Sequence, residues 1–183
     1  MTLQALIFDV DGKLAETEEL HREAFNQTFR EFGLDWHWNQ NDYRTLLKIT
    51  GGKERMLAHA AAFGMNDFDP LPLHKRKTEL YNELLAQGAM TLRPGVDTLL
   101  RKAKAKGLRL AIATTTSREN VDTLIRVTLG VHFEEWFDAV CTGEDVQRKK
   151  PDPEVYYLAL DKLRLQAGDA LVFEDKRNGL LAA

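Results

Sequence analysis

Short apolar runs alternate with amphipathic stretches over much of the 183-residue chain. The first run, residues 3–8, is typical of a short buried strand. Three similar runs, contained in "LRLAIATTTS", "FDAVCT" and "ALVFED", follow in the second half of the chain, with helical patterns between them. Strands that alternate with helices pair in parallel. The pattern therefore predicts an α/β fold: a doubly wound, Rossmann-like parallel sheet with helices on both faces.

The helices of this alternating region have recognisable start and stop signals. A helix is predicted over residues 95–106, and a second over residues 118–129 with Ser117 as its cap. Asp152 and Pro153 supply an N-cap carboxylate and a first-turn proline for a third helix.

One block interrupts the alternation, because it contains helical patterns and no convincing strand. Its candidate helices lie near residues 17–32, 41–48, 53–63 and 71–87. We therefore predict two domains. The first is a Rossmann-like core of residues 1–16 and 89–183, and the second is an inserted, mobile helical cap of residues 17–88.

Composition excludes several function classes. The formal net charge is −3 and no basic stripe is present, which argues against a nucleic-acid partner. No apolar stretch approaches the ~18 residues of a membrane helix, and no signal peptide is evident. Cys141 is the single cysteine, which favours the cytoplasm, or a compartment like the plastid stroma after processing. We expect a monomer.

Two carboxylates, Asp9 and Asp11, stand directly after the first apolar run. Like charges this close repel one another, and removal from water strengthens the repulsion. A bound cation, a shared proton or full solvation would each offset it.

Polar residues also follow the other predicted strands: Thr114 and Thr115, Lys149 and Lys150, and Glu174 and Asp175. Ligands bind at the carboxyl ends of the strands in such a sheet. Acids from two strand ends suit a hard cation such as Mg²⁺, whereas a hydroxyl and an ammonium group suit a phosphate. We therefore predict that a magnesium ion and a phosphorylated ligand complete one site.

Such a site has a definite chemistry. An Asp carboxylate can attack phosphorus and form an aspartyl-phosphate. Asp11 is placed to protonate the leaving oxygen and then to activate water, while Lys150 and the metal neutralise charge on the transferred group.

Each feature also has a simpler interpretation. The "DVDG" stretch is compatible with a solvated turn, and a calcium loop would place its glycine sixth rather than fourth. Lys149 and Lys150 are compatible with a solvated pair, "TTTS" with a helix cap and "FED" with a surface strand end. Their joint order, each at the end of a predicted strand, favours the active-site interpretation.

The stretches "FDVDG", "IAT", "KKPDP" and "FED" resemble the four motifs of the haloacid dehalogenase superfamily of phosphotransferases, and the resemblance covers essentially the whole chain. It implies Asp9 as nucleophile, Asp11 as general acid/base and Thr114 as a phosphate ligand. Lys150 is the third-motif lysine. Magnesium would be held by Asp9, Glu174, Asp175 and Asp11, the last also through its backbone carbonyl.

The helical insertion is similar to the cap of the β-phosphoglucomutase-like branch. Within that branch, "TGGKERM", "ATTTSREN" and "RKKPDPEVYYLAL" most closely resemble CbbY-type phosphatases. The resemblance implies a sugar bisphosphate such as xylulose or ribulose bisphosphate. It also implies substrate contacts from the cap, by Gly51, Gly52, Lys53, Arg55, Glu18 and His21. An exposed helix start for Lys53 and Arg55, and a surface position for His21, are the alternatives.

The chain departs from the family pattern in three places. Lys13 stands where DxDG is usually followed by Thr, and Lys176 stands where the fourth motif usually has Ser. These ammonium groups could swing outward, pair with the acids, displace magnesium or help to bind phosphate. Family members normally continue with a further strand and helix, so we expect an exposed edge on the fourth strand, with lower stability or pairing of that edge.

Three functions follow from this sequence. The leading one is a magnesium-dependent phosphatase of a small sugar phosphate or bisphosphate. The second is an intramolecular phosphoryl transfer like that of β-phosphoglucomutase, in which a sugar hydroxyl replaces water as the acceptor. The third is a catalytically impaired member that binds a phosphate ligand or a partner, a reading motivated by Lys13 and Lys176.

Overall fold

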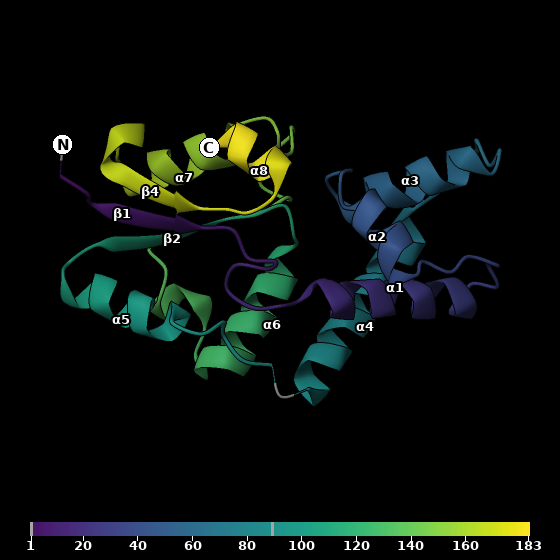
Figure 1. Cartoon of the computed structure of the whole chain (residues 1–183), viewed down its shortest axis with the longest axis horizontal. Helices are drawn as coiled ribbons and strands as arrows, with labels where there is room; N and C mark the ends of the chain where they lie inside the picture. The colour runs from purple at the N-terminus through teal and green to yellow at the C-terminus, as the bar shows by residue number, and fades with distance from the viewer. Residues whose placement is uncertain (1, 89) are drawn as a thin grey trace. The chain divides into compact units, whose positions relative to one another are not determined.

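The computed structural model describes residues 2–88 and 90–183 of the chain. These residues form two compact units: residues 2–17 with 90–183, and Glu18–Gly88. The first unit contains the sheet and the second contains helices (Figure 1).

The sheet has four parallel strands in the order β3-β2-β1-β4. They are β1 (Ala5–Phe8), β2 (Arg109–Ala113), β3 (Ala139–Cys141) and β4 (Ala170–Phe173). Figure 1 shows β4, β1 and β2 side by side. The chain runs from β1 through β2 to β3 and then returns to β4 on the other side of β1. The strand order therefore reverses beside β1, and this is the point at which doubly wound sheets bind their ligands.

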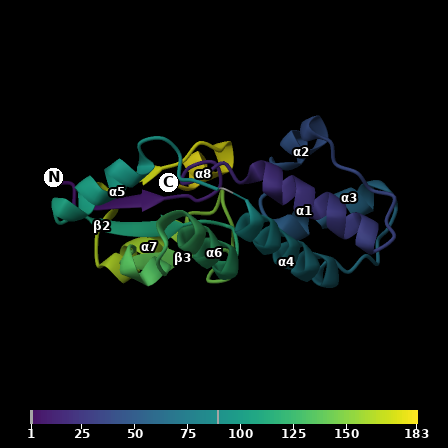
Figure 2. The same ribbon diagram turned by 90° about the horizontal axis from the view of Figure 1, so that it is seen from below.

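Helices cover both faces of this sheet. They are α5 (Val96–Ala105), α6 (Arg118–Leu129), α7 (Glu154–Leu163) and α8 (Arg177–Ala182). Figure 2 shows α5 and α7 on opposite faces. Successive side chains of β1 point to opposite faces of the sheet, and all four are buried, so β1 contributes to the core on both faces.

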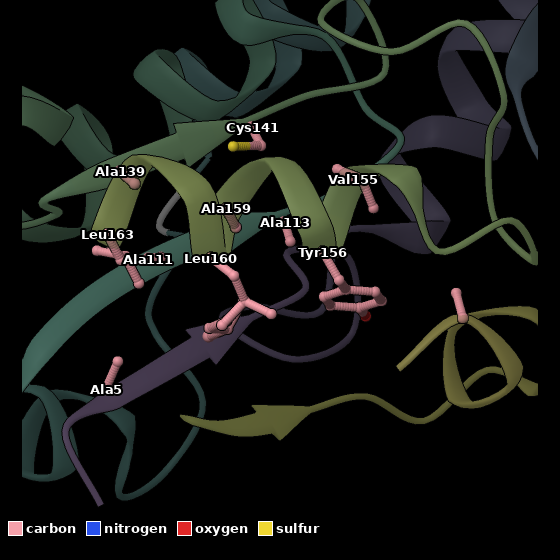
Figure 3. Packing of buried hydrophobic residues seen from close by; sticks show 12 residues of the cluster. Ala5, Ala111, Ala113, Ala139, Cys141, Val155, Tyr156, Ala159, Leu160 and Leu163 are labelled. Atoms are coloured by element: carbon pink, nitrogen blue, oxygen red, sulfur yellow. The ribbon is translucent and has the colours of Figure 1, made fainter. Parts of the chain in front are cut away.

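Small side chains allow α7 to pack closely on the strands. Ala5, Ala111, Ala113 and Ala139 form a flat surface on β1, β2 and β3, and α7 places Val155, Tyr156, Ala159, Leu160 and Leu163 over it (Figure 3). This packing fixes the orientation of α7, and so of Tyr156 near its beginning.

The α/β prediction is confirmed, as are the four strands and the alternating helices. Ser117 caps α6 as expected, since its side chain accepts a hydrogen bond from the Asn120 N–H. The start of α7 was predicted one residue early: Pro153 occupies the N-cap, and Asp152 accepts from the Glu154 N–H at 3.0 Å. Two short 3₁₀ helices, η1 (Phe133–Glu135) and η2 (Ala167–Asp169), were not predicted, because three residues carry no periodic signal.

The second unit consists of α1 (Glu18–Glu31), α2 (Gln40–Leu46), α3 (Gly52–Ala62) and α4 (Leu71–Gln87). Its core is largely aromatic, with Phe25, Phe29, Trp36, Trp38 and Tyr43 buried together. Edge-to-face and tilted ring contacts, such as Phe29 on Trp38 at 4.8 Å, fill this core.

Among the described residues, no helix has the length and apolar character needed to cross a bilayer.

Candidate active site

Asp9 is the first residue after β1 and is buried. Its N–H donates to the Phe173 carbonyl at 3.1 Å, which continues the β1–β4 ladder by one residue. Its Oδ1 accepts from Lys150 Nζ at 3.0 Å. Burial raises the pKa of the Asp9 carboxyl to about 6; the positive charge of Lys150 opposes the shift, and the negative charges of Glu174 and Asp11 add to it.

Lys150 is a buried ammonium group with three oxygen acceptors. It donates to Asp9 Oδ1, to the Ala113 carbonyl at 2.9 Å and to Glu174 Oε1 at 2.6 Å, and it lies 4.8 Å from the centre of the Tyr156 ring. Burial alone would lower its pKa, but the nearby negative charges of Asp9 and Glu174 raise the pKa of Lys150 above its usual value. The lysine is therefore held charged between strands β1, β2 and β4.

Glu174 uses both of its carboxylate oxygens for protein contacts. Oε1 accepts from Lys150 and from the Tyr156 hydroxyl at 3.3 Å. Oε2 accepts from the backbone N–H groups of Asp175 at 2.9 Å and Lys176 at 3.2 Å. Gly179 in α8 makes room for this carboxylate, because a Cβ at that position would overlap it. The geometry gives Glu174 the role of a partner for Lys150.

The Asp9–Ala15 turn positions the second carboxylate. Gly12 has φ +80°, a conformation that glycine adopts without strain, and its N–H donates to the Ala15 carbonyl at 2.9 Å. Thr17 donates its hydroxyl to Asp11 Oδ1. Arg93 fixes the turn from the other side by donating to the Gly12 carbonyl at 2.8 Å.

Hydrogen bonds hold the Thr114–Thr116 loop after β2 in place. Thr114 is buried, and its N–H donates to the Cys141 carbonyl at 3.0 Å. Its Oγ1 accepts from the Thr116 N–H at 3.3 Å, and Thr116 Oγ1 accepts from Asn120 Nδ2 at 2.9 Å. Because Thr114 Oγ1 already accepts from the backbone, its hydroxyl hydrogen remains for donation. Thr115, the next predicted residue, is half-buried.

The carboxylates suit a hard cation, although one of them has a competing partner. Asp175 lies against the Asp9–Ala15 turn, since its Oδ2 is 3.4 Å from where a Cβ on Gly12 would stand. The same Oδ2 pairs with Lys13 Nζ at 2.9 Å. Oxygen donors from two adjacent loops fit magnesium.

A second candidate group lies away from the predicted motifs. Among the described residues, Asp122, His132 and Glu134 bring their ligand atoms within 4.8 Å of one another. Two of the three are exposed, and Arg126 and His132 both contact the Asp122 carboxylate.

The predicted cap residues all belong to the second unit. Arg55 donates to the Ile49 carbonyl at 3.0 Å and to the Tyr43 hydroxyl at 3.3 Å. Gly51 has φ +98°, and Gly52 packs tightly on the rings of His74 and Phe25. Both glycines are therefore required by the fold of the unit itself.

The remaining cap residues lie along α1 and at the start of α3. Lys53 and Glu18 are half-buried. His21 is buried rather than on the surface: it stacks on Tyr81 at 4.0 Å, and its Nδ1 contacts Lys77 Nζ. The role of these residues toward a substrate stays a prediction.

Sequence reasoning missed several residues of these networks. In the sequence, Tyr156 belongs to an apolar helical face, and no pattern indicates that its hydroxyl donates to Glu174. Lys77 is buried against His21 although 56 positions separate the two residues in sequence. Thr17 lies six residues after Asp11 and could have been noticed as a helix-start hydroxyl.

Comparison with known proteins shows the family of this chain. The family model "Haloacid dehalogenase-like hydrolase" matches residues 6–183. The protein CbbY of Rhodobacter capsulatus is 54% identical over 100% of this chain and 82% of its own length.

Two similar solved structures are also CbbY proteins. A crystal structure of a CbbY mutant from Rhodobacter sphaeroides in complex with xylulose-(1,5)bisphosphate has a TM-score of 0.93, at 46% identity over 99% of this chain and 81% of that one. A structure of CbbY from the same organism in complex with phosphate has a TM-score of 0.92, at 48% identity over the same shares. The chain belongs to the haloacid dehalogenase-like hydrolases, as the motifs predicted, and CbbY proteins are among its similar relatives.

Proposed function

We propose that this chain is a phosphatase that hydrolyses a small sugar phosphate, of the bisphosphate type that includes xylulose 1,5-bisphosphate, through a phosphoryl group carried on Asp9. The observation that carries the proposal is the buried contact of Asp9 with Lys150 at the carboxyl end of β1. Lys150 also donates to the carbonyl of Ala113, the residue directly before Thr114. A carboxylate beside a fixed cation is suited to a nucleophile that must accept an anionic group.

In the first step, a carboxylate oxygen of Asp9 attacks phosphorus and the bond between phosphorus and the sugar oxygen breaks. With a pKa of about 6, Asp9 is largely ionised at neutral pH. Lys150 is bound by Glu174 and Ala113, so its charge stays in position beside the arriving phosphoryl oxygens. Thr114 donates its hydroxyl to one of them.

In the second step, water attacks the phosphorus and the bond to Asp9 breaks, which releases inorganic phosphate. Asp11 gives a proton to the sugar oxygen in the first step and takes one from water in the second. The Thr17 hydroxyl on Asp11 Oδ1 orients this carboxyl for both transfers.

Magnesium, when bound, would supply positive charge to the transferred group. Asp9, Asp175 and the backbone carbonyl of Asp11 are the oxygen donors we assign to it. Glu174 is left out of this set, because Lys150, Tyr156 and two backbone N–H groups engage its oxygens. Glu174 instead orients Lys150.

The sugar is proposed from the relatives. The CbbY structure with 46% identity contains xylulose-(1,5)bisphosphate, and a second contains phosphate. In this chain, contacts from Lys53, Arg55 and His21 to the second phosphate and the sugar belong to the same proposal. The bacterial relatives and the buried thiol of Cys141 support a cytoplasmic location.

The experiment is phosphate release from a panel of sugar monophosphates and bisphosphates, with magnesium and with excess chelator. We expect release from a pentose bisphosphate that needs magnesium and is lost in Asp9→Asn. Asp161→Asn, the same change on the exposed face of α7, should retain full release. An isomeric sugar phosphate as the product would identify a mutase, and release by Asp9→Asn would contradict the assigned nucleophile.

A further inference from the structure

Lys13 places a positive charge on a proposed metal ligand. Its Nζ pairs with Asp175 Oδ2 at 2.9 Å and donates to the Gly12 carbonyl at 2.9 Å. The Lys13 side chain is 17% exposed, against 46% for Asp175, so the lysine does not extend freely into solvent. One carboxylate oxygen and one carbonyl oxygen thus coordinate an ammonium group, and oxygen donors of these two kinds also bind a hard cation.

The charges around Asp9 are nearly balanced by the chain itself. Four carboxylates, on Asp9, Asp11, Glu174 and Asp175, are accompanied by ammonium groups from Lys150, Lys13 and Lys176. Lys150 serves Asp9 and Glu174, and the charge of Lys176 also acts on Asp9. The site therefore attracts a divalent cation less strongly than its carboxylates alone would.

We propose that Lys13 is a built-in competitor for magnesium, whose ammonium group occupies Asp175 and must be displaced before the metal binds there. The inference rests on the proposed function in taking Asp175 as a metal ligand. Lys13 is covalently attached next to the Gly12 turn, so its effective concentration at Asp175 is high whatever the solution contains. Magnesium has to overcome both this pairing and the repulsion of a nearby positive charge.

The position of the Lys13 ammonium group distinguishes among the alternatives for this side chain. A lysine that turned outward would leave Asp175 to the metal, whereas the observed pairing places the Lys13 ammonium group on Asp175 Oδ2. The contact with Asp175 selects competition with the cation.

Magnesium affinity, measured directly, tests the proposal without any substrate. Magnesium chloride is titrated calorimetrically into the full chain, and the shift of the unfolding temperature with magnesium serves as a second readout. Lys13→Met removes the charge and keeps a similar length, Lys13→Thr also shortens the side chain, and Lys13→Arg keeps the charge. Lys102→Thr makes the same chemical change on the exposed face of α5.

We expect Lys13→Met and Lys13→Thr to bind magnesium about tenfold or more tightly than the unaltered chain, while Lys13→Arg and Lys102→Thr stay within about twofold of it. Equal affinity in all variants, or no binding in any of them, would overturn the proposal. A gain in Lys13→Arg equal to that in Lys13→Met would also overturn it, because charge would not be the cause. These outcomes do not depend on phosphate release, so they are separate from the test of the phosphatase.

Discussion

Two lysines pair with carboxylates in the core unit, in contrasting surroundings. Lys150 is buried and donates to three oxygens that come from different elements. Lys13 is held at a half-exposed carboxylate within the Asp9–Ala15 turn. A buried charge is stable only while all of its partners remain, whereas a half-exposed pair can exchange with water or another cation. The first pair is therefore suited to permanent structure and the second to exchange.

The largest effect is expected from Lys150→Met. It leaves Asp9 and Glu174 buried beside each other without a counter-charge, which should cost about 3–5 kcal/mol of unfolding free energy. Phosphate release should fall by about a hundredfold or more, because the fixed positive charge is gone. Urea unfolding and phosphate assays check both; Lys106→Met, on an exposed position after α5, is the matched control. A loss below about 1 kcal/mol would remove the distinction between the two lysines.

Gly179→Ala should come next, although a change from glycine to alanine within a helix usually stabilises it. Here the new Cβ displaces the Glu174 carboxylate and so disturbs Lys150. We expect a loss of about 1–3 kcal/mol together with reduced phosphate release. Leu180→Ala, which truncates an exposed side chain of α8, should cost much less. Unfolding curves of the two variants make the comparison, and a stabilised Gly179→Ala would show that the carboxylate can move without penalty.

Tyr156→Phe tests the edge of the buried network. It removes one hydrogen bond to Glu174, at 3.3 Å, and keeps the ring over Lys150 and the packing of α7. The expected loss of unfolding free energy is about 0.5–1.5 kcal/mol. Magnesium affinity should not change. A loss as large as that of Lys150→Met would mean that the hydroxyl, rather than the lysine, organises Glu174.

The smallest effect on stability is expected from Lys13→Thr, measured with chelator present. A half-exposed pair contributes about 0–1 kcal/mol, and added salt should reduce that contribution further. Urea unfolding at low and high salt is the measurement. A salt-insensitive loss comparable to that of Lys150→Met would show that the Lys13 pair is structural and not exchangeable.

The difference between local pattern and tertiary contact decides how much of the site the sequence could predict. Apolar runs ended by polar residues predicted β1 to β4 and brought Asp9, Lys150 and Glu174 into one neighbourhood, because parallel strands end at one edge of a sheet. The sequence could not predict that Lys150, Tyr156 and two backbone amides would all donate to the Glu174 carboxylate. That depends on where Tyr156 and Gly179 lie, and both are positioned by the packing of α7 and α8.

Lys13 illustrates the same limit. Its position after Gly12 marked it as a departure from the family pattern. The sequence left four alternatives for its ammonium group: to turn outward, to pair with the acids, to displace magnesium or to help to bind phosphate. The placement of Asp175 against the turn shows that Lys13 pairs with this acid. Contacts between elements distant in sequence decide such outcomes, and they are set by tertiary packing rather than by local pattern.

The proposed mechanism requires Asp9 to carry the phosphoryl group. The most direct measurement is mass spectrometry of the chain, quenched in acid during turnover of a pentose bisphosphate with magnesium. We expect a peptide containing Asp9 to gain the mass of one phosphoryl group. The gain should be absent in Asp9→Asn and should disappear when substrate is exhausted. Phosphate release without any such labelled peptide, or with a label on another residue, would contradict the proposed mechanism.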